Sequence, residues 1–417
     1  MSQIVEGYRL SPPQRRLWTV WGSAASAPCG AFAVVEVEGP VEWQALSAAL
    51  ARVVERHEIL RTAFRRIAGM ALPLQVIAEN GYAELLERDL QELASAEQEA
   101  EIERLLLSMR SEPFELEGGG SLRATLAKLG PRRSLLILGL PALCADGEGL
   151  SLLVREIARS YGHDGSPRND EPFQYCDLAE WLNELLESED TRKGRDYWSA
   201  RVQPAWTTLR LPIGKTNLSA APQHFREAAR EVPETVFRRA REQALRFEAA
   251  PADFLLACWQ AFLWRFSGEN DFALAVEYGG RQHEPTREAF GPFARSLPFP
   301  SRLEAGVVFG EAVRAAAREA REIGRRQDFF TWEAVDGGNE VRFLPFGFVF
   351  RSPSEPLSAS GIRFTMKEER VLGEPYRIRL SCQPVSTTLR IRLSFDADFL
   401  DAADAERLLG QLQVFIE

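Results

Sequence analysis

Two successive series of strand-like and helix-like apolar patterns constrain the fold of this chain more than any other feature of its sequence. In the first half, a run rich in Val and Ala at 29–39 precedes a stretch with apolar residues at helical spacing at 41–60. Further strand patterns follow at 72–79, 121–130 and 134–140. Because alternating strands and helices are typical of an α/β domain, the first half is predicted to contain one sheet covered by helices.

The second half repeats the alternation. A strongly apolar stretch at 251–268 predicts a buried helix, and the strand pattern that follows at 271–281 ends in a glycine turn. The remaining predictions are an amphipathic helix at 306–327, strands at 341–351 and 375–399, and a last helix at 401–417. The second half is therefore predicted to contain a sheet of its own.

The length of 417 residues exceeds what one ordinary core occupies, so two domains of about 200 residues each are expected. A polar stretch with Gly, Pro and Asn at 163–172 interrupts the alternation. We place the boundary there, with an N-terminal lobe at 1–165 and a C-terminal lobe at 166–417. Two lobes of similar fold would enclose a cleft.

Charge and cysteine content argue against several classes of function. The net charge of −10 argues against a nucleic-acid partner, because such a surface needs clustered Lys and Arg. No run of about 18 apolar residues is present, and the N-terminus has no basic segment followed by an apolar core. Neither a membrane span nor a secretory signal is therefore expected. The five cysteines are scattered without a CxxC pair, so reduced thiols in a cytoplasmic protein without a bound metal are favoured.

The loop PALCADG at 141–147 is the most suggestive local feature. It joins the strand predicted at 134–140 to a helix predicted at 150–161. A strand, an acid–glycine turn and a helix commonly present a catalytic group at a sheet edge. Here, however, neither Pro141 nor Ala142 carries a side chain that exchanges a proton.

Cys144 is the candidate nucleophile in this loop. Along an extended loop alternate residues share a face, so its thiol is expected on the same side as Ala142 and Asp146. The local sequence supplies no base or cation that would activate a thiol. A small buried side chain is therefore the favoured interpretation, with a catalytic thiol as the alternative.

Several blocks of the sequence resemble the condensation-domain family of nonribosomal peptide synthetases. RHEILRTAF at 56–64 matches the second family motif almost letter for letter, and LSPPQRRLW at 10–18 resembles the first. The other similar blocks are PFELEGGGSLRATLAKL at 113–129, YCDLAEW at 175–181, YGGR at 278–281, FGPFARSLPFP at 290–300, RQDFF at 326–330 and SFDADFLDA at 394–402. The blocks are collinear with the family motifs and span nearly the whole chain.

The resemblance implies an α/β fold of two chloramphenicol-acetyltransferase-like lobes, arranged as a V-shaped pseudo-dimer with a central tunnel. Donor and acceptor carrier proteins would insert phosphopantetheine arms from opposite ends, and an amine on one arm would attack a thioester on the other. The implied partners are these carrier proteins and neighbouring megasynthase domains. The domain itself would bind no cofactor.

The PALCADG loop occupies the place of the family motif HHxxxDG, with Pro141 and Ala142 at the two histidine positions. In the family, the second histidine is expected to orient or deprotonate the nucleophile, so the catalytic residues of this chain are unknown. Asp146 and Gly147 match the motif. The resemblance implies that Asp146 is structural and pairs with Arg281, and two separate surface charges are the alternative.

Three further positions bear on the site. His283 follows the glycine–arginine turn and could reach the tunnel, although an exposed loop histidine is favoured. Arg295 and Ser296 stand where the family has an Asn-Thr pair at the tunnel. A guanidinium there would need an anionic partner, such as a substrate carboxylate or phosphate, or it would turn to solvent.

These observations leave two functions open. The first is amide bond formation between carrier-tethered acyl and aminoacyl groups by a condensation domain with a non-standard active site. The second is a catalytically silent condensation-like domain that serves as a docking platform or gate for carrier proteins or a tailoring enzyme. The retained family motif blocks and Asp146 favour a tunnel that still accepts substrates, whereas the loss of both motif histidines favours a redirected function.

Overall fold

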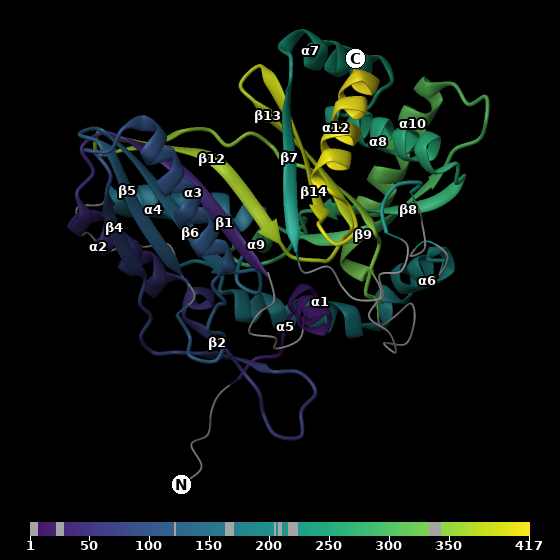
Figure 1. The fold of residues 1–417 in the computed structure, drawn as a ribbon. Helices are drawn as coiled ribbons and strands as arrows, with labels where there is room; N and C mark the ends of the chain where they lie inside the picture. The colour runs from purple at the N-terminus through teal and green to yellow at the C-terminus, as the bar shows by residue number, and fades with distance from the viewer. Residues whose placement is uncertain are drawn as a thin grey trace. The chain divides into compact units, whose positions relative to one another are not determined.

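The computed structural model describes residues 7–21, 29–120, 122–162, 171–203, 206, 211–215, 224–332 and 343–417. Over these residues the chain is a mixed α/β protein built on two six-stranded sheets, with a small third sheet of two strands (Figure 1). It divides into two compact units, each made of several segments. The first contains Met1–Glu187, Gly279–Ala294 and Ser354–Gly373, and the second contains Ser188–Tyr278, Arg295–Pro353 and Glu374–Glu417.

The predicted domain boundary after residue 165 lies within 163–170, outside the described residues. The compact units differ from a single cut at that point. The segment that ends at Glu187 belongs to the first unit, as do Gly279–Ala294 and Ser354–Gly373. The second half of the chain therefore returns twice to the first unit.

The first unit is built on a sheet in which β4 and β5 are parallel and all other neighbours are antiparallel. In spatial order its strands are β11 (Leu357–Ala359), β12 (Ile362–Leu372), β1 (Gly30–Glu38), β6 (Arg133–Pro141), β5 (Arg123–Gly130) and β4 (Glu84–Asp89). The apolar run predicted at 29–39 forms β1, where Val35 and Val37 are fully buried. Two shorter strands, β2 (Thr62–Arg65) and β3 (Leu74–Ile77), form the small sheet.

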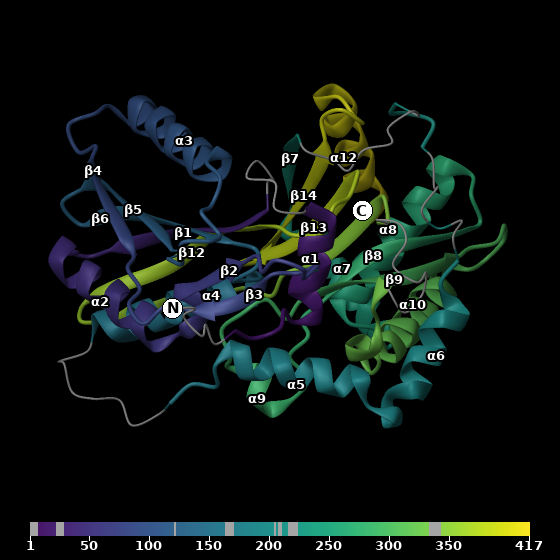
Figure 2. The same cartoon turned by 90° about the horizontal axis from the view of Figure 1, so that it is seen from below.

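Helices cover both faces of the first sheet. Figure 2 shows α3 on one side and the pair α2 and α4, which pack against each other, on the opposite side. The helices of this unit are α1 (Pro12–Trp21), α2 (Trp43–Arg56), α3 (Ser95–Ser111), α4 (Gly147–Tyr161), α5 (Tyr175–Glu187) and α9 (Glu284–Arg287). The helix predicted at 41–60 is shorter than expected. It ends at Arg56, because His57 has an extended backbone (φ −112°, ψ 106°) and the 3₁₀ helix η1 (Glu58–Arg61) follows.

The second unit has its own sheet and a buried helix with apolar residues on every side. In spatial order the strands are β7 (Phe225–Val232), β14 (Thr388–Asp396), β13 (Ile378–Val385), β10 (Phe346–Phe350), β8 (Asp271–Tyr278) and β9 (Arg295–Arg302). The buried helix is α8 (Pro251–Ser267), in which residues 254–263 are all buried. It packs against α7 (Glu234–Arg246), α10 (Phe309–Gly324) and α12 (Ala402–Ile416), so these helices form one layer. The remaining helices are α6 (Arg192–Arg201), η2 (Glu189–Thr191) and η4 (Gln327–Phe329).

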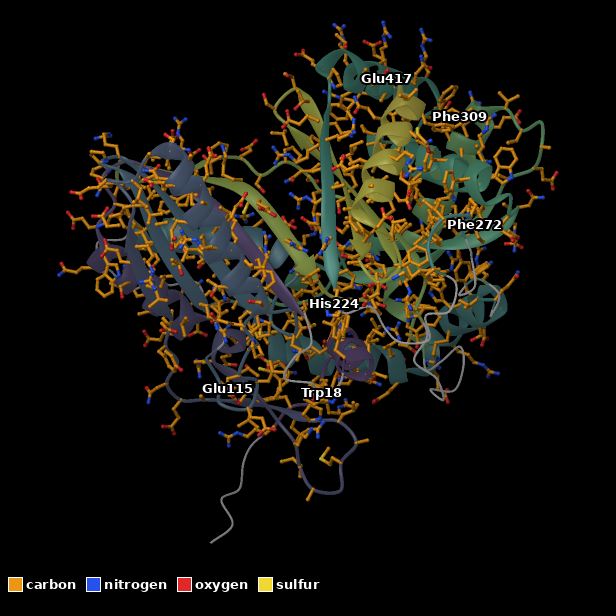
Figure 3. All side chains as sticks on the ribbon, viewed as in Figure 1. Trp18, Glu115, His224, Phe272, Phe309 and Glu417 are labelled. Atoms are coloured by element: carbon orange, nitrogen blue, oxygen red, sulfur yellow. The ribbon has the colours of Figure 1, made fainter. Side chains whose placement is uncertain are left out.

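Each unit encloses an apolar core of its own. In the second unit, Phe272 of β8 is buried, and Phe309 lies at the start of α10 (both labelled in Figure 3). The ring of Phe309 packs edge-on against that of Phe254, with ring centroids 5.7 Å apart. In the first unit, Leu138 of β6 and Leu50 of α2 have no exposed surface. Among the helices described, none is long and apolar enough to cross a membrane.

Candidate active-site loop

The PALCADG loop is a buried turn between β6 and α4. The amide N–H of Ala142 donates to the carbonyl of Cys29 at 3.4 Å, which extends the β1–β6 pairing by one residue beyond Pro141. The amide N–H of Cys144 then donates to the Pro141 carbonyl at 2.8 Å and closes the turn. Ala142 is only 1% exposed and Asp146 only 4%. The loop is therefore part of the core of the first unit.

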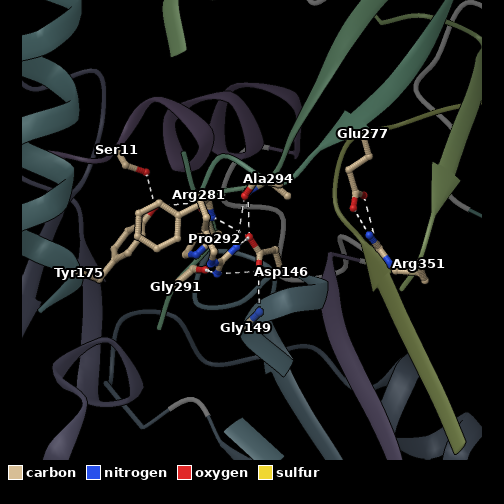
Figure 4. A network of polar contacts seen from close by, with 12 residues as sticks. Ser11, Asp146, Gly149, Tyr175, Glu277, Arg281, Gly291, Pro292, Ala294 and Arg351 are labelled. Atoms are coloured by element: carbon tan, nitrogen blue, oxygen red, sulfur yellow. Dashed lines mark hydrogen bonds and ion pairs between the residues drawn. The ribbon is translucent and has the colours of Figure 1, made fainter. Parts of the chain in front are cut away.

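Asp146 joins the start of α4 to the segment 279–294 (Figure 4). As the N-cap residue of α4, it accepts a hydrogen bond at Oδ1 from the amide of Gly149 at 2.7 Å. Its Oδ2 accepts from the amides of Phe293 and Ala294, both at 2.8 Å. The guanidinium of Arg281 completes the arrangement with Nη1–Oδ2 and Nη2–Oδ1 distances of 2.7 and 3.0 Å.

The charge of Asp146 is fixed by these contacts. Burial by itself would raise the pKa of the Asp146 carboxyl. The charge and hydrogen bonds of Arg281, together with the amides of Gly149 and Ala294, outweigh burial and hold this pKa below its ordinary value. The carboxylate is therefore ionised at neutral pH, and its two oxygens already accept hydrogen bonds from Gly149, Arg281, Phe293 and Ala294.

The glycine–arginine turn is shaped to deliver Arg281 to Asp146. Gly280 has a positive φ of 68°, and a Cβ at this position would lie 2.0 Å from the carbonyl oxygen of Phe293. Glycine is therefore required for the close approach of the two backbones. Arg281 also donates through Nη2 to the carbonyl of Gly291 at 2.9 Å, and its guanidinium lies 4.7 Å from the centre of the Phe293 ring.

Two other motif blocks support the same loop. Gln14, at the start of α1, donates through Nε2 to the carbonyl of Leu143 at 2.9 Å. The hydroxyl of Tyr175, at the start of α5, donates to the carbonyl of Pro292 at 2.8 Å and shares a hydrogen bond with Ser11 at 2.7 Å (Figure 4). The blocks at 10–18, 175–181 and 290–300 thus meet around a single turn.

The two alternative catalytic candidates lie in different surroundings. Cys144 has no exposed surface and belongs to the apolar core of the first unit. Beside it, burial raises the pKa of the Cys29 thiol to about 12. His283 precedes α9, and its imidazole packs edge-on against Trp181 of α5 with ring centroids 4.8 Å apart. Among the described residues, no group of His, Cys, Asp and Glu could hold a metal ion.

Arg295 has a partner that the sequence did not suggest. In the second unit its side chain is 7% exposed, and Nη1 donates to the carbonyls of Gln327 and Asp328 at 3.2 and 2.9 Å. The Asp328 carboxylate lies 3.9 Å from Nη2. The guanidinium therefore neither turns to solvent nor needs a substrate anion, because the RQDFF block supplies its acceptors. Ser296, the next residue of β9, pairs with Glu277 of β8 in the strand register.

The Condensation domain family matches residues 4–417. The chain belongs to the condensation-domain family. This condensation domain is similar to a linear gramicidin synthase of Brevibacillus parabrevis, with 26% identity over 98% of the chain. It is also similar to the phosphinothricin tripeptide synthetase PhsC of Streptomyces viridochromogenes, with 29% identity over 92% of the chain. The matching parts are 5% and 35% of the two relatives' lengths, so the chain spans only a part of each.

Solved structures share the fold of this condensation domain. The condensation domain of the monacolin K polyketide synthase MokA superposes with a TM-score of 0.85 at 20% identity and covers 100% of this chain and 97% of that one. The X-domain in its complex with OxyB from teicoplanin biosynthesis gives a TM-score of 0.80 at 19% identity, with coverage of 100% and 94%. The mixed α/β architecture with two sheets is thus that of condensation-domain structures.

Sequence reasoning missed a partly buried ion pair of this condensation domain. Arg351, just after β10, pairs with Glu277 of β8 through both guanidinium nitrogens, one of them 3.2 Å from Oε2 (Figure 4). The two residues are 74 positions apart and become neighbours because β8 and β10 are adjacent parallel strands. Both residues lie within strand patterns predicted from the sequence, at 271–281 and 341–351, but those patterns do not indicate which strands are neighbours, so the pairing of the two side chains could not be predicted.

Proposed function

We propose that this condensation domain forms an amide bond between acyl and aminoacyl groups presented by donor and acceptor carrier proteins on phosphopantetheine arms. The groups would meet in the tunnel that the family resemblance implies, beside Ala142. The observation that supports this proposal is the retained pair of Asp146 and Arg281, which holds the loop in a defined geometry. The proposal includes neighbouring megasynthase domains as partners and a cytoplasmic location without nucleic-acid or membrane contacts.

The chemistry needs no imidazole when the acceptor is an amine. The amine nitrogen would attack the thioester carbonyl, the carbon–sulfur bond would break, and the proton lost by nitrogen would leave with the sulfur as a thiol. An α-amine has a pKa near 8, so roughly a tenth of it is already the neutral nucleophile at pH 7. A hydroxyl acceptor would need a base that Pro141 and Ala142 do not provide.

The magnitudes favour positioning as the main source of rate. General acid–base assistance is typically worth about 10² to 10⁴ in rate. Alignment of two bound reactants reaches effective molarities of about 10⁵ to 10⁸ M. A domain that keeps its scaffold and loses its histidine would therefore keep the larger contribution.

The test mixes the purified domain with a loaded donor carrier protein and matched acceptor carriers that bear an amine or a hydroxyl. Mass spectrometry measures the condensed product. We expect amide product from the unaltered domain, no ester product, and a faster amide reaction from Ala142→His. Ester formed as fast as the amide would overturn the proposed mechanism.

The silent docking platform or gate is the second candidate function. Two observations favour it: the loop around Ala142 is apolar and buried, and the fold matches an X-domain whose solved structure is a complex with OxyB. In this case the partner would be a carrier protein or a tailoring enzyme. Product from Ala142→His, but none from the unaltered domain, would support this second function.

A further inference from the structure

A network of buried hydrogen bonds links β3 to the PALCADG loop. It contains the side chains of Gln75 in β3 and Gln14 in α1, which are 1% and 0% exposed. Gln14 donates through Nε2 to the Leu143 carbonyl and to Oε1 of Gln75, both at 2.9 Å. Gln75 donates through its own Nε2 to the carbonyl of Arg9 at 2.8 Å. The network thus connects the segment before α1, the small sheet and the middle of the loop.

The orientation of the Gln14 amide is set at the start of α1. Its Oε1 accepts from the backbone N–H of Ser11 at 2.9 Å, and the Ser11 hydroxyl accepts from the backbone N–H of Gln14 at 3.2 Å. Together the two hydrogen bonds form a reciprocal cap of the helix. Because Ser11 occupies Oε1, the two hydrogens of Nε2 face the acceptors on Leu143 and Gln75.

Gln75 fixes the same amide from the other side. Its backbone exchanges two hydrogen bonds with Tyr8, each 2.9 Å long, and it pairs with Phe64 in the register of β2 and β3. Since its Nε2 donates to Arg9, its Oε1 is the atom that faces Gln14. The reversed amide would place its NH₂ group against the NH₂ group of Gln14 and its oxygen against the Arg9 carbonyl. A single orientation therefore satisfies both neighbours.

The contact with Leu143 acts on the backbone that carries Ala142. The Leu143 carbonyl belongs to the peptide group that leads to Cys144, inside the turn that the Cys144 amide closes. The backbone N–H of Ala142 and the side chain of Asp146 hold the two ends of this loop. Gln14 adds a hydrogen bond at its middle. Rotation of that peptide group would move the backbone of the adjoining residues.

We propose that Gln75 is a positioning residue of the PALCADG loop. It fixes the amide of Gln14, which holds the Leu143 carbonyl and thereby the backbone beside Ala142. The effect on loop geometry stands by itself, whereas the effect on turnover rests on the proposed amide-forming function. Because a misplacement of about 1 Å can lower the rate of a positioned reaction about a hundredfold, a small movement of the loop should be measurable.

The experiment compares two variants of the full chain that each remove one buried or partly buried glutamine amide. Gln75→Met nearly keeps the size of the side chain and removes the acceptor that Gln14 uses. Gln98→Met is the matched control. Gln98 of α3 also joins separate parts of the first unit, because its Nε2 donates to the carbonyls of Leu90 at 2.9 Å and Leu129 at 3.1 Å.

Hydrogen exchange followed by mass spectrometry reports on the two regions separately. We expect exchange over 141–147 to be about tenfold faster in Gln75→Met than in the unaltered chain, with no change over 90–98. Gln98→Met should show the opposite pattern. Unchanged exchange over 141–147 in Gln75→Met, or an equal increase there in both variants, would overturn the proposal.

A conservative variant tests whether the hydrogen bond to Gln14 is responsible. Gln75→Glu keeps the length of the side chain and, in either protonation state, an oxygen that accepts from Gln14. Exchange over 141–147 should therefore stay close to that of the unaltered chain. Exchange as fast as in Gln75→Met would contradict the role of this hydrogen bond. Gln75→Asn, which is one methylene shorter and withdraws the acceptor, replaces Gln75→Met if that variant does not fold.

Turnover is measured as the single-turnover rate constant with an amine acceptor and the domain in saturating excess. Under these conditions the rate constant does not depend on the folded fraction of the domain. It should fall about tenfold or more in Gln75→Met and stay unchanged in Gln98→Met. An unchanged rate constant in Gln75→Met would refute its effect on the reaction. If the unaltered domain forms no amide, the proposed function fails, and the exchange pattern alone decides the role of Gln75.

Discussion

Replacement of Asp146 by Asn should lower the unfolding temperature of the first unit by about 10 °C. The variant keeps the size of the side chain and the N-cap of α4, but it leaves the charge of Arg281, whose side chain is 8% exposed, without its carboxylate. Breaking a buried ion pair by removal of one partner costs about 3–5 kcal/mol. For a unit of roughly 200 residues, each kcal/mol corresponds to about 2–4 °C.

Differential scanning calorimetry measures this change. Glu148→Gln is the matched control, because Glu148 lies in the same first turn of α4, is exposed, and loses the same charge. Its unfolding temperature should change by no more than about 2 °C. The double variant Asp146→Asn with Arg281→Gln should cost less than Asp146→Asn alone, because no charge is then left buried without a partner. An Asp146→Asn variant as stable as Glu148→Gln would refute the structural role of the carboxylate.

The difference in stability between the unaltered protein and Asp146→Asn should decrease as the pH falls into the acid range. The folded-state pKa of Asp146 is lowered, mainly because Arg281 outweighs the effect of burial. Its stabilising contribution is therefore complete above the pKa of the unfolded carboxyl, about 3.9, and is lost as the pH falls through the lower folded value. The gap between the unaltered protein and Asp146→Asn should stay constant from about pH 8 to 5 and shrink only in stronger acid. A gap that shrinks already near pH 6 would contradict the lowered pKa.

Local geometry leads to three further predictions. Gly280→Ala should lower the free energy of unfolding, measured in urea, by more than about 2 kcal/mol, because Gly280 has a positive φ and a Cβ there would collide with the Phe293 carbonyl. The control Gly279→Ala should change it by less than about 0.5 kcal/mol, because the space around Gly279 is open. Arg295→Ala should lower the free energy of unfolding by about 3 kcal/mol or more, because it removes a buried cation from its acceptors. Arg302→Ala, on the same strand but with a side chain that is 65% exposed, should lower it by less than about 1 kcal/mol. Equal losses for the two variants would contradict a stabilising role of the buried Arg295 guanidinium. Cys29, whose thiol pKa burial raises to about 12, should react with iodoacetamide at pH 8 about a thousandfold more slowly in the native than in the unfolded protein, measured by peptide mass mapping.

The sequence predicted the elements whose apolar pattern is strong and local. The runs at 134–140 and 251–268 became β6 and α8, because both are largely buried and carry few polar residues. The strand β12 was missed. Its sequence, IRFTMKEERVL, carries charges at several positions, and it becomes the neighbour of β1 only through pairing across more than 300 residues. No local pattern encodes such a distant register.

Some features of the candidate site could be predicted from the sequence, and others could not. The loop at 141–147 and its lack of a proton-exchanging histidine are visible in the sequence itself, and the partner of Asp146 could be suggested only through the family resemblance. The acceptors of Arg295 could not be predicted, because they are backbone carbonyls of a 3₁₀ turn more than 30 residues away. Long-range contacts made by a backbone leave no signature in side-chain types.

The most direct test of base-free amide formation is the pH dependence of the single-turnover rate with an amine acceptor on its carrier protein. The unaltered domain should show a rate that rises with the fraction of neutral amine, with a midpoint near pH 8 and no step near pH 6.5. Ala142→His should add a step in the range where imidazole titrates. A step near pH 6.5 in the unaltered domain would reveal a histidine base elsewhere in the chain and would contradict the account.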